Sequence, residues 1–193
     1  MNIEKIESFI SKIPDYPKPG ILYYDISTMI NNSEAFSACI DHLGNAVKSY
    51  SFEKIGAIDA RGFIFASALA KTLKKGLTMI RKKNKLPGDV KSLSYNLEYG
   101  SDTLEINQNV KNEKFIIVDD LLATGGTGQA SCKLIKESGG IVECFLSLIE
   151  LVISFGFIEP YNSPFSLLSL LNTKVLLFIC FEISLYLFLI SLF

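Results

Sequence analysis

The segment Phe115-Ile-Ile-Val-Asp-Asp-Leu-Leu-Ala-Thr-Gly-Gly-Thr127 decides the fold of this chain. Its first four residues, Phe115 to Val118, form a short apolar run that is typical of a buried strand. Asp119 and Asp120 follow at the expected end of that strand, and small residues then lead into a helical pattern over 127–138. The order of strand, paired carboxylates, small-residue loop and helix predicts an anion-binding turn in an α/β sheet.

The loop from Ala123 to Thr127 is suited to a phosphate. Its small side chains let backbone N–H groups converge on an anion at a helix N-terminus, where the helix dipole favours negative charge. The loop is neither Gly-x-x-x-x-Gly-Lys nor Gly-x-Gly-x-x-Gly. An ordinary turn capped by threonine is the alternative, but the two adjacent carboxylates favour a site for a sugar that carries a phosphate.

Length, charge and cysteine content narrow the class of protein. The chain of 193 residues suits one domain with a sizeable core, and its net charge of −1 argues against nucleic-acid binding through a basic surface. The four cysteines (Cys39, Cys132, Cys144 and Cys180) show no CxxC or metal-ligand spacing, so we expect reduced thiols. The charged N-terminus does not resemble a signal peptide. We therefore expect a cytoplasmic protein.

Strand and helix patterns alternate over residues 1–150. Isoleucines at 3, 6, 10 and 13 predict a helix that ends at Pro14, and Ser33 is the expected cap of a second helix that ends near Tyr50. Further helices are expected at 62–74 and 127–138, and strands at 55–58, 77–80, 92–97, 103–106, 115–118 and 141–149. The pattern predicts a mostly parallel central sheet with helices on both faces and a protruding hairpin near Tyr99. Residues 59–62 and 119–127 should then share the rim where ligands bind.

Charged residues lie after several of these strands. Arg61 is suited to bidentate binding of pyrophosphate oxygens, although an ordinary surface arginine is the alternative. Arg81, Lys82 and Lys85 form either a solvated loop or an anion-binding loop, in the same subunit or a neighbouring one. Glu98, beside Tyr99 in the polar hairpin, could hydrogen-bond a ring nitrogen of a base, but by sequence alone it is indistinguishable from a surface glutamate. His42, the only histidine, has no catalytic or metal-binding pattern around it, and we interpret it as structural or exposed.

Several motifs, in order along the chain, resemble the adenine phosphoribosyltransferase family of type I phosphoribosyltransferases. They are Tyr16-Pro-Lys-Pro-Gly20, Tyr24-Asp-Ile-Ser27, Asp59-Ala-Arg-Gly-Phe63, Leu86-Pro-Gly88, Leu97-Glu-Tyr-Gly100, Leu104-Glu-Ile106 and the segment 118–127. The resemblance covers roughly residues 5–150. It implies the type I phosphoribosyltransferase fold, with a small N-terminal hood over residues 1–30 and a flexible hairpin.

The resemblance implies transfer of the 5-phosphoribosyl group from 5-phosphoribosyl-1-pyrophosphate (PRPP) to adenine, giving AMP and pyrophosphate in purine salvage. Asp119 and Asp120 would hold the ribose hydroxyls, while Glu98, near the adenine N7, would be the general acid/base, with Tyr99 on the same hairpin. Leu22 and Tyr24 would hold adenine, although the family commonly has arginine in place of Tyr24. The remaining PRPP-binding residues would be Arg61, Arg81, Lys82, Lys85, Ala123, Thr124, Gly125, Gly126 and Thr127. Mg²⁺ held mainly by the substrate and a homodimer are also implied. The alternatives are a catalytically inactive PRPP-binding protein and a phosphoribosyltransferase for another purine base.

The C-terminal part departs from this resemblance. Residues 151–193 contain only three charged side chains, Glu159, Lys174 and Glu182. The family's charged segment after Glu150 is replaced by an apolar one. We therefore expect a phosphoribosyltransferase domain at 1–150, an altered closing segment at 151–171, in which residues 164–168 resemble the family's closing strand, and an atypical hydrophobic tail at 172–193.

The tail has three interpretations. As a helix, residues 175–193 would be about 28 Å long, close to the thickness of a bilayer core, and would form a C-terminal membrane anchor. The tail could instead be an out-of-frame or unspliced translation product, or an apolar element buried at an oligomer interface.

Overall fold

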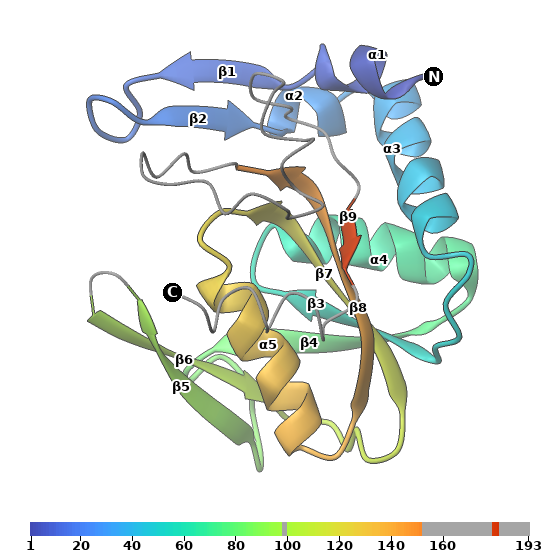
Figure 1. The fold of residues 1–193 in the computed structure, drawn as a ribbon, viewed down its shortest axis with the longest axis vertical. Helices are drawn as coiled ribbons and strands as arrows, with labels where there is room; N and C mark the ends of the chain where they lie inside the picture. Colours follow the sequence, from blue (N-terminus) through green and yellow to red (C-terminus); the bar gives the residue numbers. More distant parts are fainter. Residues whose placement is uncertain (98–99, 152–178, 182–193) are drawn as a thin grey trace, which may run out of the picture.

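A seven-stranded sheet forms the centre of the protein (Figure 1). The computed structural model describes residues 1–97, 100–151 and 179–181. The strand order is β5-β6-β4-β3-β7-β8-β9. The four central strands are β4 (Gly76–Lys82), β3 (Lys54–Ile58), β7 (Lys114–Leu122) and β8 (Ile141–Glu150), and they run parallel. The predicted α/β fold with a mostly parallel sheet is confirmed.

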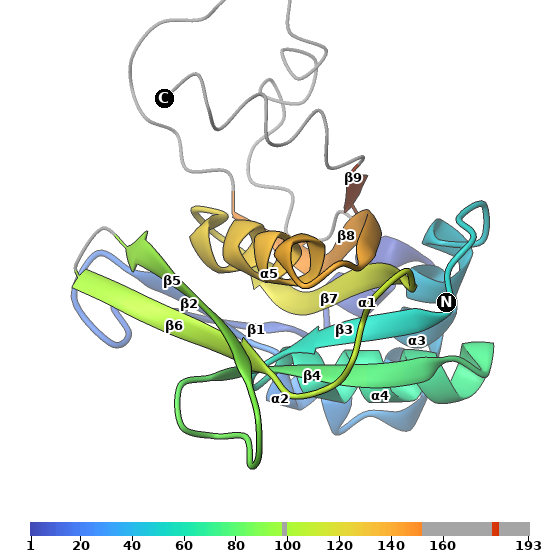
Figure 2. The same cartoon turned by 90° about the horizontal axis from the view of Figure 1, so that it is seen from below.

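The sheet ends in antiparallel strands on both sides. On one side, β5 (Lys91–Leu97) and β6 (Gly100–Ile106) form the predicted hairpin, which joins the sheet through the pairing of β6 with β4. On the other side, the short strand β9 (Ile179–Phe181) pairs with Phe145, Leu146 and Ser147 of β8. The hairpin therefore extends away from the parallel centre (Figure 2).

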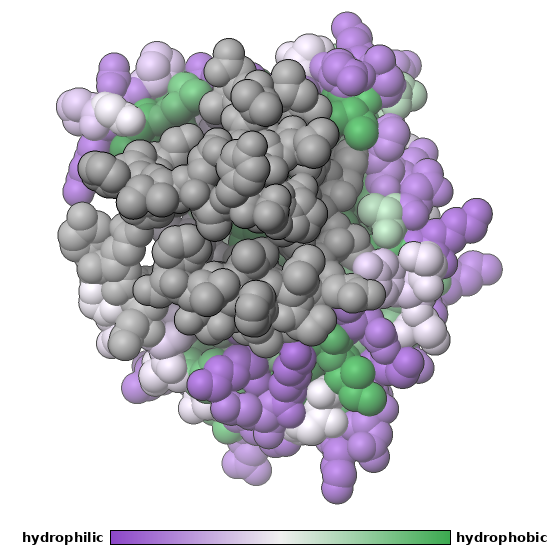
Figure 3. All heavy atoms as spheres, in the orientation of Figure 1, coloured by the Kyte–Doolittle hydropathy of each residue, from purple (hydrophilic) through white to green (hydrophobic). Residues whose placement is uncertain are grey.

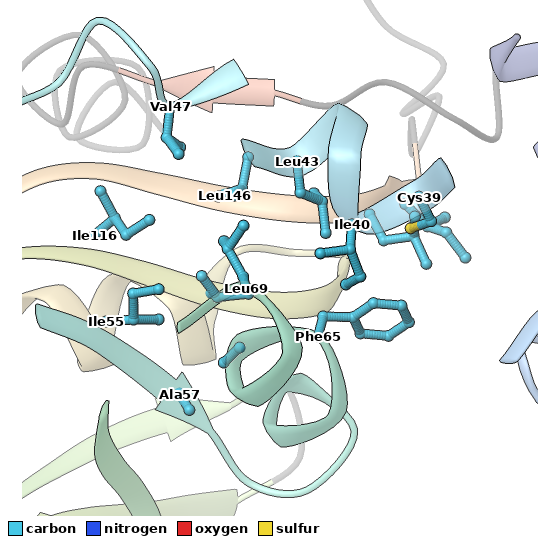
Figure 4. Packing of buried hydrophobic residues seen from close by; sticks show 14 of the residues in the cluster. Cys39, Ile40, Leu43, Val47, Ile55, Ala57, Phe65, Leu69, Ile116 and Leu146 are labelled. Carbon is cyan, nitrogen blue, oxygen red and sulfur yellow. The ribbon is translucent and has the colours of Figure 1, made fainter. Parts of the chain in front are cut away.

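Helices cover both faces of the sheet (Figure 2). Helices α3 (Ser33–Ala46) and α4 (Gly62–Leu73) pack on one face, and α5 (Gly126–Glu137) packs on the other. Figure 4 shows the first face, where Ile40 and Leu43 of α3 and Phe65 and Leu69 of α4 meet strand residues that include Ile116. Because apolar side chains point to both faces of β7, this strand is buried between two hydrophobic clusters.

The N-terminal helix is shorter than the isoleucine spacing predicts. Helix α1 covers only Ile3–Glu7, and Ser11–Pro14 form strand β1, which pairs antiparallel with β2 (Leu22–Asp25). Ile6 and Ile10 are buried, whereas Ile13 is 40% exposed. The helical prediction for residues 8–13 was therefore wrong, because pairing with β2 outweighs a weak local preference for helix. Helix α2 (Ser27–Ile30) completes this part of the chain.

Several element boundaries also differ from the predictions. Helix α3 ends at Ala46 rather than near Tyr50, and β6 begins at Gly100 rather than at Thr103. Asn32, rather than Ser33, caps α3, because its side chain accepts a hydrogen bond from the Ala35 N–H at 2.9 Å. Strand β7 does not end at Val118 but continues to Leu122, since its ladder with β8 runs through Asp119↔Ser147 to Leu122↔Glu150. The two carboxylates thus belong to the strand itself.

Little of the C-terminal tail lies within the described residues. Leu151 and residues 179–181 are described, whereas the segment that resembles a closing strand and most of the expected anchor lie outside them. At 179–181 the chain is a strand, not part of the helix that the anchor interpretation requires. Among the described residues, no helix has both the length and the apolar character needed to cross a membrane. The described residues at the lower and right-hand margins of the face in Figure 3 are mostly hydrophilic.

Candidate active site

The carboxyl ends of β3 and β7 bring two polar loops together. The two strands are parallel neighbours, with Ala57 opposite Val118, so residues 59–62 and the segment that follows Asp119 lie side by side. Arg61 and Asp120 form an ion pair between Nη2 and Oδ2 at 2.9 Å. The predicted shared rim is therefore confirmed.

Gly62, at the start of α4, sets the distance between these loops. A Cβ atom at this position would lie 2.9 Å from the Val118 carbonyl oxygen, 3.0 Å from Asp119 Oδ1 and 3.1 Å from Asp119 Cα. Real Cβ atoms do not approach backbone this closely, so only glycine lets α4 begin directly against β7. The small residue next to Arg61 thus places the guanidinium beside the paired carboxylates.

Asp119 and Asp120 are held in a poorly solvated position. Asp120 is only 5% exposed, and its N–H donates to Asp119 Oδ1 at 2.9 Å. Burial raises the pKa of Asp119 well above its usual range, and the neighbouring Asp120 charge raises it further. Burial also raises the pKa of Asp120, although Arg61 opposes this shift. A nearby cation or a set of hydroxyl donors would therefore stabilise the ionised forms of this pair.

The loop after β7 leads into α5 without a capping side chain. Gly125 occupies the N-cap position with φ 83°, a left-handed conformation that glycine adopts without strain, and it makes no side-chain capping hydrogen bond. Ala123 and Thr124 are exposed. The helix N-terminus therefore offers backbone N–H groups and the positive end of its dipole to an anion, as the sequence predicts.

The N-terminal segment reaches this rim through Tyr23. In Figure 1 strands β1 and β2 lie beyond the carboxyl ends of β7 and β8. The Tyr23 hydroxyl accepts a hydrogen bond from Arg61 Nη1 at 3.2 Å, and the guanidinium carbon lies 5.7 Å from the centre of the Tyr23 ring. Leu22 is 43% exposed, but Tyr24 is 6% exposed and belongs to the core. The Tyr24 ring is therefore buried and has no open face on which a purine could stack in this structure.

The basic residues at the end of β4 and directly after it are less closely gathered. Arg81 Nε donates to Asp59 Oδ2 at 3.1 Å, and its Nη1 donates to the Lys85 carbonyl oxygen at 3.2 Å. Arg81 thus lies beside the rim and holds the loop that contains Lys85, whose side chain is exposed. Lys82 pairs instead with Asp102 of β6. The structure brings Arg81 to the rim and directs Lys82 towards the hairpin.

Part of the hairpin contacts the start of α5. The Tyr95 hydroxyl lies 3.3 Å from the Thr127 hydroxyl, so β5 contacts the start of α5. Glu98 and Tyr99, the expected acid/base residue and its neighbour, lie outside the described residues. Tyr95 therefore gives the observed link between the hairpin and the rim.

Three residues at this site were not selected from the sequence as having a role. Tyr23, Asp59 and Tyr95 each contact a predicted PRPP-binding residue. Alternation along β2 would have placed Tyr23 and Tyr24 on opposite faces, but it does not say which face meets Arg61. The roles of Asp59 and Tyr95 follow from contacts between segments far apart in the sequence, and no local sequence pattern indicates such contacts.

The fold and this rim are those of a phosphoribosyltransferase. In agreement, residues 27–148 match the phosphoribosyl transferase domain family. Adenine phosphoribosyltransferase of Pelagibacter ubique is 45% identical over 148 residues, which are 76% of this chain and 85% of that protein. The chain belongs to the adenine phosphoribosyltransferase family.

Solved structures agree with this assignment. The crystal structure of adenine phosphoribosyltransferase from Thermoanaerobacter pseudethanolicus is 43% identical, with a TM-score of 0.77 over 80% of this chain and 91% of that one. The enzyme from Saccharomyces cerevisiae, solved with an imino-altritol bisphosphate and adenine, is 32% identical, with a TM-score of 0.72 over 77% and 88% of the two chains.

Proposed function

We propose that this protein transfers the 5-phosphoribosyl group of PRPP to adenine, with AMP and pyrophosphate as products. The ion pair between Arg61 and Asp120 is the observation that carries the proposal. It places a group suited to pyrophosphate beside a group suited to ribose hydroxyls, next to the uncapped N-terminus of α5. These three groups match the pyrophosphate, ribose and 5-phosphate of one PRPP molecule.

Each residue has a separate task in the proposed reaction. The bond between ribose C1 and pyrophosphate breaks with its electron pair on pyrophosphate, where Arg61 and Arg81 bind the developing charge. Asp119 and Asp120 hold the ribose hydroxyls, and residues 123–127 hold the 5-phosphate, so that C1 faces the base. The lone pair of adenine N9 then forms the bond to C1, and Glu98 accepts the proton that adenine loses from N7. Leu22 of the hood contacts the base.

The carboxylates at the rim fit a role for Mg²⁺. Among the described residues, no group of three or more His, Cys, Asp or Glu side chains could hold a metal ion. Mg²⁺ usually binds one or two carboxylates together with substrate phosphates and water, and the buried pair Asp119 and Asp120 would favour a nearby cation. Mg²⁺ bound with PRPP would neutralise charge on the pyrophosphate. Chelation by EDTA should therefore abolish activity, and added Mg²⁺ should restore it.

The reaction itself tests the proposal. Purified full-length protein incubated with PRPP, Mg²⁺ and adenine should form AMP and pyrophosphate in equal amounts. Hypoxanthine and guanine, tested in competition with adenine, should react much more slowly; a preference for either would instead identify an enzyme for another purine. PRPP binding measured by calorimetry without AMP formation would identify an inactive PRPP-binding protein.

Variants of Glu98 test the proposed acid/base step. Glu98→Ala should lower kcat by about 10²-fold or more, because general acid–base catalysis typically contributes that much, while the affinity for PRPP stays the same. Glu4→Ala, at an exposed position in α1, is the matched control and should retain full kcat. An unchanged kcat in Glu98→Ala would remove Glu98 from the mechanism.

We further propose that the protein is a homodimer joined through β4 and α4. Leu77 and Met79 on β4 are 38% and 37% exposed, and Ile64 on α4 is 40% exposed. Leu77 and Met79 pair in register with Ile55 and Ala57, so all four point to the face that α4 covers. Arg81 borders this apolar surface, since its guanidinium carbon lies 5.8 Å from the centre of the Phe63 ring. A second copy on this surface would bring its loop of basic residues close to the rim.

Sedimentation of suitable variants tests the dimer. Leu77→Glu combined with Met79→Glu should give a monomer, because buried unpaired charges oppose association. Ile141→Glu, at a position that is 47% exposed at the start of β8, is the control and should leave the dimer intact. Dimers in both variants would exclude this surface as the interface.

We propose a cytoplasmic location, because buried thiols that stay reduced are typical of that reducing compartment. Cys39, Cys132 and Cys144 are buried, and burial raises the pKa of Cys39 and of Cys132 to about 12, so both of these thiols stay protonated. Fractionation of cells that express the full-length chain should recover it in the cytosol; recovery in the membrane fraction would support the anchor.

A further inference from the structure

Arg61 is shared between the hood and the sheet. Its Nη2 pairs with Asp120 Oδ2 at 2.9 Å, and its Nη1 donates to the Tyr23 hydroxyl at 3.2 Å. The two partners are far apart in sequence and lie on different sheets, since Tyr23 belongs to β2 and Asp120 to β7. The guanidinium is therefore held from two sides.

The two partners act differently on a substrate. A guanidinium has five N–H donors, so contacts through Nη1 and Nη2 leave others for the oxygens of a bound anion. Asp120 is negatively charged when ionised and competes with pyrophosphate for Arg61, whereas Tyr23 is neutral and does not. The half-buried Tyr23 also limits where the guanidinium can lie, because it provides a hydroxyl and a nearby ring face.

We propose that the Tyr23 hydroxyl is a positioning group that keeps the Arg61 guanidinium directed towards the pyrophosphate of PRPP. This inference rests on the proposed function of the rim. Without the hydroxyl, Arg61 is held by Asp120 and the remaining ring only, and the binding of pyrophosphate must then order a more mobile side chain. The hydroxyl therefore acts on PRPP and pyrophosphate, while the retained ring still fills its space in the hood.

The variant Tyr23→Phe tests the proposal, because it removes the hydroxyl and keeps the ring. Calorimetric titration with PRPP and Mg²⁺ should give a Kd about three- to tenfold higher than in the wild type, as expected for one lost hydrogen bond to a charged group. The KM for PRPP and the inhibition constant of pyrophosphate should rise by the same factor. The KM for adenine, kcat and Tm should not change.

The hood offers a matched control. Tyr16 is 53% exposed and packs edge-on against Tyr23 with ring centres 5.1 Å apart. Tyr16→Phe removes a hydroxyl from the same hood and should leave the affinity for PRPP as in the wild type. In an Arg61→Ala background, Tyr23→Phe should cause no further loss of PRPP affinity, because the hydroxyl acts through Arg61.

Each outcome decides the proposal. A PRPP affinity of Tyr23→Phe equal to that of Tyr16→Phe overturns it, and so does a joint loss of PRPP affinity, adenine affinity and Tm, which would indicate a general structural role. If the wild type binds PRPP without making AMP, the proposed function fails, and the Kd values alone still decide the role of Tyr23. If the wild type does not bind PRPP, both proposals fail.

Discussion

The rim at β3 and β7 and the hairpin of β5 and β6 both contribute to the candidate site, but they are held in different ways. At the rim, there is no room for a Cβ atom between Gly62 and the β7 backbone, and Asp120 is almost fully buried. The hairpin extends from the sheet. The short pairing of β6 with β4 joins it to the sheet, and polar side-chain contacts such as Tyr95 with Thr127 and Asp102 with Lys82 add to that link. Substitutions at the rim should therefore have larger effects than substitutions in the hairpin, because close packing leaves the rim no room to adjust.

Gly62→Ala should have the largest effect. The added methyl group would meet the Val118 carbonyl and Asp119, and since backbone must then move, we expect a loss of about 1–3 kcal/mol in stability. Displacement of Asp119 and Arg61 should lower kcat/KM by about 10²-fold. Thermal unfolding and AMP formation measure the two effects.

Gly44→Ala in α3 provides the control for that substitution. A Cβ atom there would lie 3.7 Å from Leu69 Cδ1, which is ordinary van der Waals contact, and alanine favours a helix more than glycine does. Stability should stay the same or rise by up to about 1 kcal/mol, with full activity. Similar behaviour of the two variants would contradict the close packing described for Gly62.

Asp120→Asn should separate activity from stability. Activity should fall by about 10²-fold, since the amide cannot replace the carboxylate at the ribose. Stability should change by less than about 1 kcal/mol, because a buried charge is removed and Arg61, whose side chain is 37% exposed, remains in contact with water. Asp41→Asn, at an exposed position on α3, should leave both unchanged. A large loss of stability in Asp120→Asn would show that the ion pair mainly holds the fold together.

Tyr95→Phe tests the contact between the hairpin and the start of α5. Loss of the contact with the Thr127 hydroxyl should raise the KM for PRPP by about two- to fivefold, the effect of one ordinary hydrogen bond. Ser94→Ala removes a neighbouring hydrogen bond, to Thr103 within the hairpin, and should leave that KM unchanged. Equal effects in steady-state assays would mean that the hairpin, not the link, matters.

Lys82→Met should have the smallest effect. The hydrogen bond with Lys82 lowers the pKa of Asp102, and the same bond raises the pKa of Lys82. The stabilisation is therefore present at neutral pH, is lost as the pH falls through the lowered pKa of Asp102, and is lost as the pH rises through the raised pKa of Lys82. Because the Lys82 side chain is 53% exposed, we expect less than about 1 kcal/mol at pH 7. Denaturant unfolding at pH 3, 7 and 11 should show the largest difference from the wild type at pH 7 and smaller differences at pH 3 and pH 11.

The sequence predicted the elements of the sheet better than it predicted the N-terminal segment. Apolar runs such as Phe115 to Val118 are long enough to require burial, so their strands appear where expected. The isoleucines at 10 and 13 fit a helix equally well, but residues 11–14 pair with β2, and this pairing depends on a segment that lies beyond an intervening loop. Periodicity describes local preference only, and tertiary pairing decides between similar local preferences.

The composition and order of residues predicted the class of site, because a phosphate-binding loop needs small residues at a helix N-terminus and a sugar needs nearby carboxylates. Asp119, Asp120 and residues 123–127 could therefore be selected from the sequence alone. The tertiary structure decided which side chains surround them: Tyr23 rather than Tyr24 meets Arg61, and Arg81 meets Asp59. These contacts join segments that are 38 and 22 residues apart, and their geometry follows from the register of the parallel strands and the close approach at Gly62.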